Sequence, residues 1–423
     1  MSWNKISKVL GPGLIFASMA IGVSHLVQST RAGANYGFAL LWIIIAANVF
    51  KYPFFEFAGR YANATGESLI DGYNRLGKVP LWIYLIVTVG SMFFVMGAVG
   101  FVTVGFLDNL LGLSSIFPDF ELFPTVLLFV VCTGILLLGK YAVLDNLIKV
   151  IGVVLLISTL LAFVLTLMNG PVTKLPDFTP ANPYSETGLL FIIALMGWMP
   201  TAVDMATWNS LWTLEKIRTT GYHPTLKETT SEFNFGYIVA AGLSICFLTL
   251  GAYLIQGTGI TMPNGSADFA SKVVTLYTDT IGDWSFLIIS ASAFSIMFGT
   301  SIAVFDGYAR ALERTIELAF LSEEDSKKAL DNSKAYNLSL IVLAIGSFLL
   351  IARFLEHFKL LIDIATTISF LIAPIVAVAN LKLVSEKYVG KEAVPPKWMI
   401  VLSYAGIVFL AGFALFFLYV RLF

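Results

Sequence analysis

The chain is built from long apolar runs that are separated by short polar connectors. A helix needs about 20 apolar residues to cross the hydrocarbon core of a bilayer. Eleven segments reach this length, at 11–33, 37–58, 80–106, 122–139, 143–168, 188–213, 233–257, 283–308, 335–353, 358–384 and 397–421. Because the connectors are too short for a soluble domain, the pattern predicts one all-α integral membrane domain over residues 1–423.

The composition supports this prediction and excludes several classes of protein. Hydrophobic residues make up 57% of the chain, charged residues make up 13%, and the mean hydropathy is +0.84. A soluble protein carries about 25% charged residues. A soluble enzyme, a disordered chain and a basic nucleic-acid binder are therefore excluded. Cys132 and Cys246 lie within apolar runs, so we expect two buried thiols and no disulfide.

The distribution of basic residues predicts the orientation in the membrane. Most of the 26 Lys and Arg residues lie in the connectors on one side of the predicted helices. Positive charge in connectors favours the cytoplasmic side. We therefore expect a multi-pass protein of a bacterial inner (plasma) membrane, with a cytoplasmic N-terminus and an external C-terminus. Ser24, His25 and Gln28 lie at the centre of the first run, which argues against a cleaved signal peptide.

Two of the predicted helices are interrupted near their centres. In the first, Gly22 precedes Ser24 and His25, which combines a weak helix former with side chains that can bind the backbone. In the sixth, Gly197 and Pro200 lie three residues apart, and proline removes a backbone donor. One such interruption is typical of a kink, whereas irregular backbone at this depth requires a lining of protein or water.

The two breaks open two successive blocks of five helices. We expect one repeat at about 11–168, an inverted repeat at about 188–384 and an extra helix at about 397–421. Matching interruptions in two halves are typical of a secondary transporter whose site lies between the breaks. This arrangement favours alternating access over an open channel or a purely structural protein.

Several short motifs resemble a known family. They are the GPG at Gly11–Gly13, the RAGA at Arg31–Ala34, the stretches 40–50, 64–69 and 139–151, and the Met199-Pro200 pair. In these residues the chain resembles the NRAMP (natural resistance-associated macrophage protein) family of metal-ion transporters. The resemblance implies a LeuT-type fold of 5+5 inverted repeats with an eleventh helix, and a divalent metal ion as the substrate.

The chain departs from the family in the residues that carry its chemistry. The family has Asp-Pro-Gly-Asn in the helix-1 break, whereas residues 22–25 here read Gly-Val-Ser-His. The family has Met-Pro-His in helix 6, whereas residues 199–201 here read Met-Pro-Thr. The family has acidic residues on its proton route in helix 3, and the sequence has none between 80 and 105. The resemblance therefore implies that the usual proton route is missing.

The candidate site lies between the two breaks. We expect it to be lined by Gly22, Ser24, His25, Met199, Thr201 and Asp204. His25 and Met199 are the candidate metal ligands because nitrogen and thioether donors suit soft or borderline metals. Neither break contains a carboxylate, so a dehydrated Mn²⁺ or Fe²⁺ should bind weakly. A hydrated cation near Asp204 is one alternative. A small non-metal solute, such as an anion held by half-helix N-termini, is the other.

Two of these residues also have structural interpretations. His25 either hydrogen-bonds a carbonyl of a neighbouring helix or acts as a ligand or titrating group. Asp204 either supplies the missing negative charge or pairs with a polar group on another helix. Asp145 is expected to pair with Lys149, and Asp306 with Arg310. Lys51 and Glu56, near the cytoplasmic end of helix 2, are expected to snorkel to the surface or to form gate-side pairs. The resemblance implies that a polar residue of helix 10 approaches the site, and Thr366, after Asp363, lies near that position.

No enzyme motif accompanies these features. The sequence contains no P-loop and no HExxH motif, and it has only three histidines. We therefore expect no enzymatic activity and no cofactor. The expected partners are a small transported solute or ion and the lipid bilayer, not a nucleic acid, and the protein is expected to act as a monomer.

Overall fold

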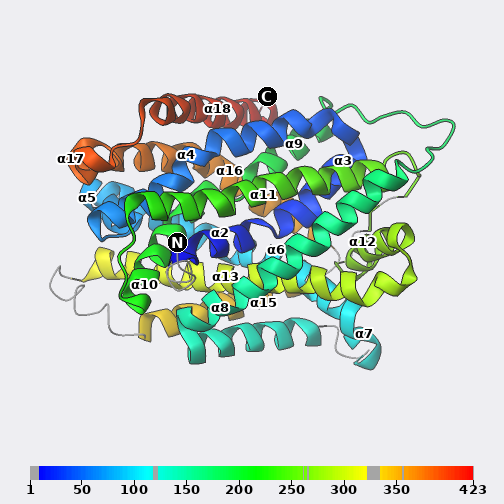
Figure 1. The fold of residues 1–423 in the computed structure, drawn as a ribbon, viewed down its shortest axis with the longest axis horizontal. Coiled ribbons are helices and arrows are strands. Elements are labelled where there is room, and N and C mark those ends of the chain that lie inside the picture. The colour runs from blue at the N-terminus through cyan, green and yellow to red at the C-terminus, as the bar shows by residue number, and fades with distance from the viewer. Residues whose placement is uncertain are drawn as a thin grey trace.

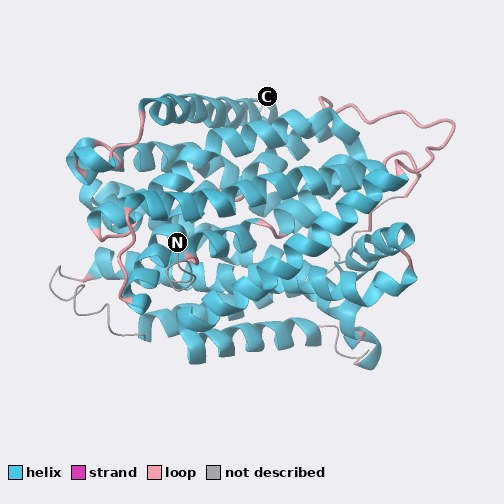
Figure 2. Cartoon of the chain, in the orientation of Figure 1, coloured by secondary structure: helices cyan, strands magenta, loops and turns pink. Residues whose placement is uncertain are grey.

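A computed structural model describes residues 9–117, 122–260, 262–263, 266–321, 334–354 and 357–422. Within these ranges the chain is helical and contains no strand. Figure 2 shows loops at the two ends of the bundle and short loop segments inside it. The basic residues of the predicted connectors at 1–8 and 322–333 lie outside the described residues.

The membrane helices follow the apolar segments in chain order (Figure 1). They are α2 (Pro12–Ala20) and α3 (Thr30–Tyr36), joined by the π-helix η1 (Ser24–Ser29), then α4 (Leu41–Thr65), α6 (Lys78–Leu111), α8 (Phe123–Asn169), α9 (Glu186–Trp198) with α10 (Ala206–Thr220), α11 (Leu226–Leu254), α13 (Phe286–Phe320), α15 (Lys334–Arg353), α16 (Phe358–Leu383) and α18 (Lys397–Leu422).

Shorter helices connect these elements. They are η2 (Gly37–Leu40), α5 (Leu69–Leu76), α7 (Leu113–Ile116), η3 (Val203–Met205), α12 (Ser266–Ile281), η4 (Asp283–Ser285), α17 (Glu386–Val389) and η5 (Lys391–Ala393). Among the described residues, eight helical runs are long and apolar enough to cross a membrane, and the first, Pro12–Thr65, contains the first two predicted segments.

The fourth and fifth predicted segments differ from the prediction. The structure joins them in the single helix α8 of 47 residues. The intervening residues 140–142 contain neither glycine nor proline, so nothing in them ends the helix. Figure 1 shows that the ribbon of α8 changes direction sharply between its two halves, so the two predicted segments run in different directions.

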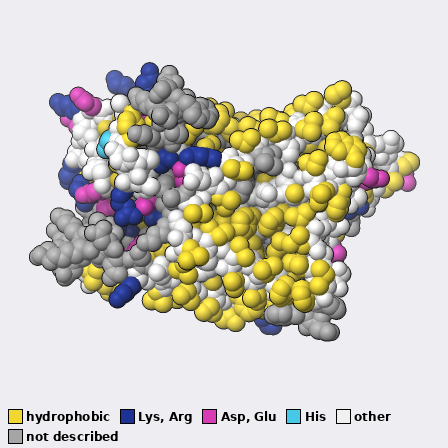
Figure 3. Space-filling view, turned by 60° about the horizontal axis from the view of Figure 1, so that its bottom comes forward, with side chains coloured by type: hydrophobic (Ala, Val, Ile, Leu, Met, Phe, Trp, Pro, Cys, Tyr) yellow, Lys and Arg dark blue, Asp and Glu magenta, His cyan; other side chains and the backbone are white. Residues whose placement is uncertain are grey.

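The broken helices lie at the centre of the bundle. In the most apolar part of the α9–α10 run 89% of the residues are buried, against 22% in α18. Helix α2 packs against α11, α13 and α8, and α9 packs against α16. Figure 3 shows a hydrophobic surface over the middle of the molecule and Lys and Arg side chains gathered at one end. Both breaks are therefore enclosed by protein, as membrane depth requires.

The GPG motif positions the start of α2 against α11. Gly11 has no side chain to cap the helix, and the Glu232 carboxylate of α11 accepts the N–H groups of Gly11 and Gly13, each at 2.9 Å. A Cβ on Gly13 would lie 2.7 Å from the Glu232 carbonyl oxygen, and one on Gly236 would lie 2.1 Å from the Gly13 carbonyl oxygen. The motif thus permits close packing and leaves the cap to another helix.

Glu232→Gln is expected to lower the free energy of unfolding by about 1–2 kcal/mol, because the amide loses the charge and one of the two acceptor oxygens. Thermal unfolding of the purified protein in detergent measures the change. Glu186→Gln is the control, since Glu186 is an exposed residue in the first turn of α9. Equal melting temperatures for wild type and Glu232→Gln would contradict this role.

Candidate functional site

The break in helix 1 lies at Ile21 and Gly22. Helix α2 ends at Ala20, and Ile21 leaves the helical region with φ −83° and ψ 54°. A Cβ on Gly22 would lie 2.6 Å from the side chain of Thr300 on α13. Thr300 therefore occupies the space into which a larger residue at position 22 would extend, and this packing excludes a carboxylate there.

Side-chain hydroxyl groups bind the carbonyls that this break frees. Thr300 Oγ1 donates to the carbonyl of Ser18 at 2.8 Å. Ser24 Oγ donates to the carbonyl of Ala20 at 2.5 Å. The end of α2 thus has protein partners for two of its carbonyls, which removes part of the cost of irregular backbone in the membrane.

The break in helix 6 follows Trp198. The Met199-Pro200 peptide bond is cis, and regular helix resumes after η3. A Cβ on Gly197 would lie 2.0 Å from the Thr366 carbonyl oxygen, so α9 and α16 touch at the backbone. Trp198 Nε1 also donates to Ser369 Oγ of α16 at 3.0 Å. The first half of helix 6 is therefore held against helix 10 at the break.

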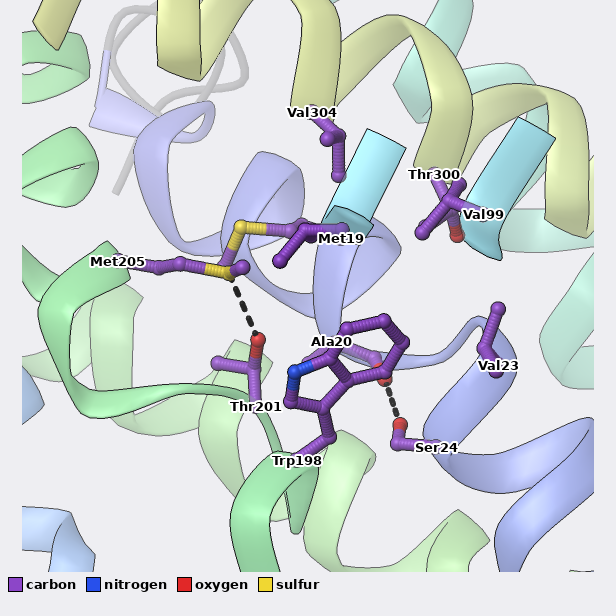
Figure 4. Close-up of a pocket in the computed structure, with 11 residues that line it drawn as sticks. Met19, Ala20, Val23, Ser24, Val99, Trp198, Thr201, Met205, Thr300 and Val304 are labelled. Carbon is purple, nitrogen blue, oxygen red and sulfur yellow. Dashed lines mark hydrogen bonds between the residues drawn. The ribbon is translucent and has the colours of Figure 1, made fainter. Parts of the chain in front are cut away.

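A small cavity lies between the two breaks (Figure 4). Its volume is about 20 Å³. The lining comes from the helix-1 break (α2 and η1), from α6, from the helix-6 break (α9 and η3) and from α13. The residues are Met19, Ala20, Val23, Ser24, Val95, Val99, Trp198, Thr201, Met205, Thr300 and Val304. The polar side chains of these lining residues carry hydroxyl oxygens, thioether sulfurs and an indole nitrogen, and no Asp or Glu of the described residues lines the cavity.

Two of the predicted site residues line this cavity. They are Ser24 from helix 1 and Thr201 from helix 6. Thr201 Oγ1 donates to the Met205 sulfur at 3.3 Å. Met199 is fully buried outside the lining, and Gly22 packs on Thr300. The two breaks thus lie close together, but only Ser24 and Thr201 of the six predicted residues line the cavity.

His25 points away from the cavity, toward α11. Its Nε2 donates to the carbonyl of Ala240 at 2.8 Å, and its Nδ1 lies 2.6 Å from Ser24 Oγ. The side chain is fully buried. Because both ring nitrogens have protein partners, coordination of a metal by His25 would require the imidazole to break one of these hydrogen bonds.

Asp204 is buried in η3, one turn after the break. Its Oδ1 has no hydrogen-bond partner among the described residues. Lys51 on α4 interacts with it electrostatically. A buried carboxylate oxygen without a donor is costly in a membrane protein, and a nearby cation offsets part of that cost.

The other predicted pairs have mixed outcomes. Asp145 pairs with Lys149 at 2.7 Å, as predicted, and also with Lys216 at 2.8 Å. Asp306 pairs with Arg310 at 2.8 Å, as predicted.

The prediction for Lys51 and Glu56 is wrong. Glu56 pairs with Arg60 at 2.6 Å. Lys51 is fully buried and donates to two carbonyls in the last turn of α9 and to the Thr201 carbonyl in the helix-6 break. It therefore neither reaches the membrane surface nor forms a gate with Glu56.

Asp363 lies away from the break, where it joins helices 1 and 10. It accepts from Arg31 Nη1 at 2.9 Å and from Gln28 Nε2 at 3.2 Å. Arg31 also lies over the ring of Phe191 on α9, 5.0 Å from its centroid. This cluster therefore connects the end of helix 1 beyond its break with helices 6 and 10. Thr366 meets the break through its backbone carbonyl, against Gly197.

Sequence reasoning missed most of the residues at the site, among them Met19, Met205 and Lys51. Figure 4 shows the side chains of Met19 and Met205 extending toward one another. Met19 lies about one helical turn before Gly22, and Met205 lies four residues after Thr201, so helical spacing alone places both near the breaks. Among the described residues there is no group of three or more His, Cys, Asp or Glu that could hold a metal.

Comparison with known proteins finds similarity over nearly the whole chain. The family model for natural resistance-associated macrophage protein-like proteins, Nramp, matches residues 13–420. This chain belongs to the Nramp family. An uncharacterized protein of Pasteurella multocida is 35% identical over 419 residues, which cover 99% of this chain and 93% of that protein. A protein named divalent metal cation transporter MntH, from Verminephrobacter eiseniae, is 27% identical over 132 residues, 30% of this chain and 28% of the relative.

The fold of this Nramp protein also matches solved structures. The manganese transporter of Eremococcus coleocola aligns with a TM-score of 0.70 and 13% identity, and the alignment covers 98% of this chain and 86% of that one. The predicted class, an all-α LeuT-type transporter fold, is confirmed. The chain is an integral, multi-pass membrane transporter of the Nramp family.

Proposed function

We propose that this Nramp protein is a secondary transporter that carries a divalent metal ion by alternating access, with its N-terminus in the cytoplasm. Two similar proteins support a metal ion, since one is named a manganese transporter and the other a divalent metal cation transporter. The cavity between the helix-1 and helix-6 breaks is the transport site in this proposal. We propose that the protein acts as a monomer in the lipid bilayer.

The size of the cavity carries the proposal. A volume of about 20 Å³ holds a group about as large as one water molecule. A single ion without its outer water shell fits this space, whereas an amino acid or another organic solute is several times larger. The cavity therefore favours an ion over the non-metal solute that the sequence also allows.

The donors on the cavity wall define which ions suit it. Met19 and Met205 contribute thioether sulfurs, and Ser24 and Thr201 contribute hydroxyl oxygens. Thioethers favour soft ions, and the hard ions Mg²⁺ and Ca²⁺ require oxygen ligands with charge. Because no carboxylate lines the cavity, we expect weak binding and a preference for soft ions such as Cd²⁺ over Mn²⁺ and Mg²⁺.

We also propose that this protein lacks the proton route that is usual for the family. Residues 80–105 of α6 contain no acidic side chain, and Thr201 follows the Met199-Pro200 pair where the family has histidine. The metal gradient then drives transport, or His25 or Asp204 carries the coupling. Proton movement during metal uptake that persists in both His25→Ala and Asp204→Asn would contradict this part of the proposal.

Met19→Leu and Met205→Leu are each expected to weaken Cd²⁺ binding by about tenfold, a loss of about 1.4 kcal/mol, because leucine keeps the volume and removes the sulfur. Calorimetric titration of the purified protein with Cd²⁺, Mn²⁺ and Mg²⁺ measures this, followed by uptake into proteoliposomes.

Met297→Leu is the control, since Met297 is fully buried on α13 and does not line the cavity. His25→Ala and Met199→Ala test the site as the sequence places it. If only these two variants lose binding, the metal binds at His25 and Met199 and not in the cavity. Absence of binding for every divalent ion in wild type would favour a non-metal solute.

A further inference from the structure

Lys51 occupies an unusual position for a lysine in a membrane protein. It lies within α4 and is fully buried. Its Nζ donates to the carbonyl oxygens of Met196 at 2.5 Å, Gly197 at 3.0 Å and Thr201 at 3.1 Å. All three carbonyls belong to the helix-6 break or to the last turn before it. The ammonium therefore uses its three donors on the last turn of α9 and on the irregular backbone that follows it.

The position of these carbonyls explains why a positive charge is stable there. The last carbonyls of a helix have no partner within the helix, and the C-terminal end of a helix carries partial negative charge. Unwound carbonyls and half-helix C-termini in the breaks of transporters are suited to bind small cations. In this chain the end of α9 directs such carbonyls at the Lys51 ammonium.

A second group supports a cation at this position. Asp204 is buried, its Oδ1 has no hydrogen-bond partner among the described residues, and it interacts electrostatically with Lys51. Removal of the ammonium alone would leave three carbonyl oxygens without their cation and the buried Asp204 carboxylate without its electrostatic partner. Such a set of oxygen donors is the kind that binds a small cation.

We propose that Lys51 is a built-in cation that completes the helix-6 break. Its ammonium takes the position of a dissociable monovalent cation, so the break keeps its shape without one. Loss of the Lys51 side chain should then create a binding site for a monovalent cation, formed by the carbonyls of Met196, Gly197 and Thr201, and the Asp204 carboxylate should attract the cation electrostatically.

Chemical rescue of Lys51→Ala tests this proposal directly. Alanine removes three carbons and the ammonium, and n-propylammonium supplies the same atoms. In a buffer whose cation is N-methylglucamine, we expect Lys51→Ala to melt below wild type. Addition of n-propylammonium chloride should then raise its melting temperature in a saturable manner by about 3 °C or more, and Na⁺ or K⁺ should act in part. Wild type should not respond.

Three controls separate a cation site from filling of a cavity. Neutral 1-propanol has the same shape without the charge and should not rescue Lys51→Ala. The double variant Lys51→Ala/Asp204→Asn should respond to n-propylammonium at least about fivefold more weakly, because the carboxylate attraction is gone. Lys216→Ala removes another buried lysine, whose partner Asp145 keeps Lys149, and should show no rescue.

A folded Lys51→Ala variant that responds to no monovalent cation, or responds equally to 1-propanol, would overturn the proposal. Two further variants cover the case in which the alanine variant does not fold. Lys51→Arg retains a buried cation and should melt within a few degrees of wild type, whereas Lys51→Met retains the stem without the charge and should melt lower. A Lys51→Met variant as stable as wild type would also overturn it. All melting temperatures are measured without metal, so their outcome is independent of the metal titration.

Discussion

Asp306→Ala is expected to lower the free energy of unfolding by about 3–5 kcal/mol, the cost of removing one partner of a buried ion pair. Asp306 on α13 is fully buried. Its carboxylate accepts from Arg310 Nε at 2.8 Å, from Trp212 Nε1 at 2.8 Å and from the Tyr336 hydroxyl at 2.7 Å. These donors come from α13, α10 and α15, so one carboxylate joins three helices. Alanine leaves the half-buried Arg310 with the more distant Glu215 carboxylate, at 3.4 Å.

Thermal or denaturant unfolding in detergent measures this loss. The change should also affect transport, because Trp212 belongs to α10, the second half of the broken helix. Asp283→Ala is the control, since Asp283 is an exposed carboxylate at the start of η4, and its change should stay within about 0.5 kcal/mol. A loss of less than about 1 kcal/mol in Asp306→Ala would show that the three helices hold together without this carboxylate.

The sequence was sufficient to predict the fold because the relevant signals are local. Length and hydropathy locate the membrane segments, and the motifs at Gly11–Gly13 and 139–151 point to the family. One difference in element structure, the continuous α8, arises because residues 140–142 contain no helix breaker and because Gly139, just before them, lies within the helix without ending it. Pairs four residues apart on one helix, such as Asp145 and Lys149, are also predictable from spacing.

The site was less predictable because it depends on which face of a helix meets which neighbour. Lys51 lies near the end of the predicted segment 37–58, which suggested that it snorkels to the surface. The helix α4 continues through polar residues to Thr65, so Lys51 lies in its interior instead. Similarly, Thr300 reaches position 22 from a helix far away in sequence, and no local pattern predicts that contact.

Gly197→Ala is the substitution that tests the backbone contact between α9 and α16 at the helix-6 break. The added Cβ would lie 2.0 Å from the carbonyl oxygen of Thr366 and 2.7 Å from its carbonyl carbon. These are backbone atoms of α16, so no side-chain rotation relieves the collision, and α9 and α16 must separate. Overpacking of a tight interface costs about 1–3 kcal/mol, and a backbone collision lies at or above the upper end.

Separation of α9 from α16 should impair transport even in protein that still folds. Gly197 accepts from Lys51, and the next residue, Trp198, donates to Ser369 and lines the cavity. Movement of α9 therefore shifts one wall of the cavity and the hydrogen bonds of the break together. We expect the rate of Cd²⁺ uptake into proteoliposomes to fall by about tenfold or more, which corresponds to about 1.4 kcal/mol of activation free energy.

Gly242→Ala is the matched control for this substitution. Gly242 also lies within a membrane helix, α11, and a Cβ added there meets no atom within 4 Å. Alanine is the better helix former, so Gly242→Ala should leave uptake unchanged and should not lower the melting temperature. Loss of uptake in Gly197→Ala alone would show that the approach of helix 6 to helix 10 sets the geometry of the site. Equal behaviour of the two variants would mean that this contact is loose enough to accept a methyl group, and that the break is positioned by Lys51 and by the ends of helix 6 instead.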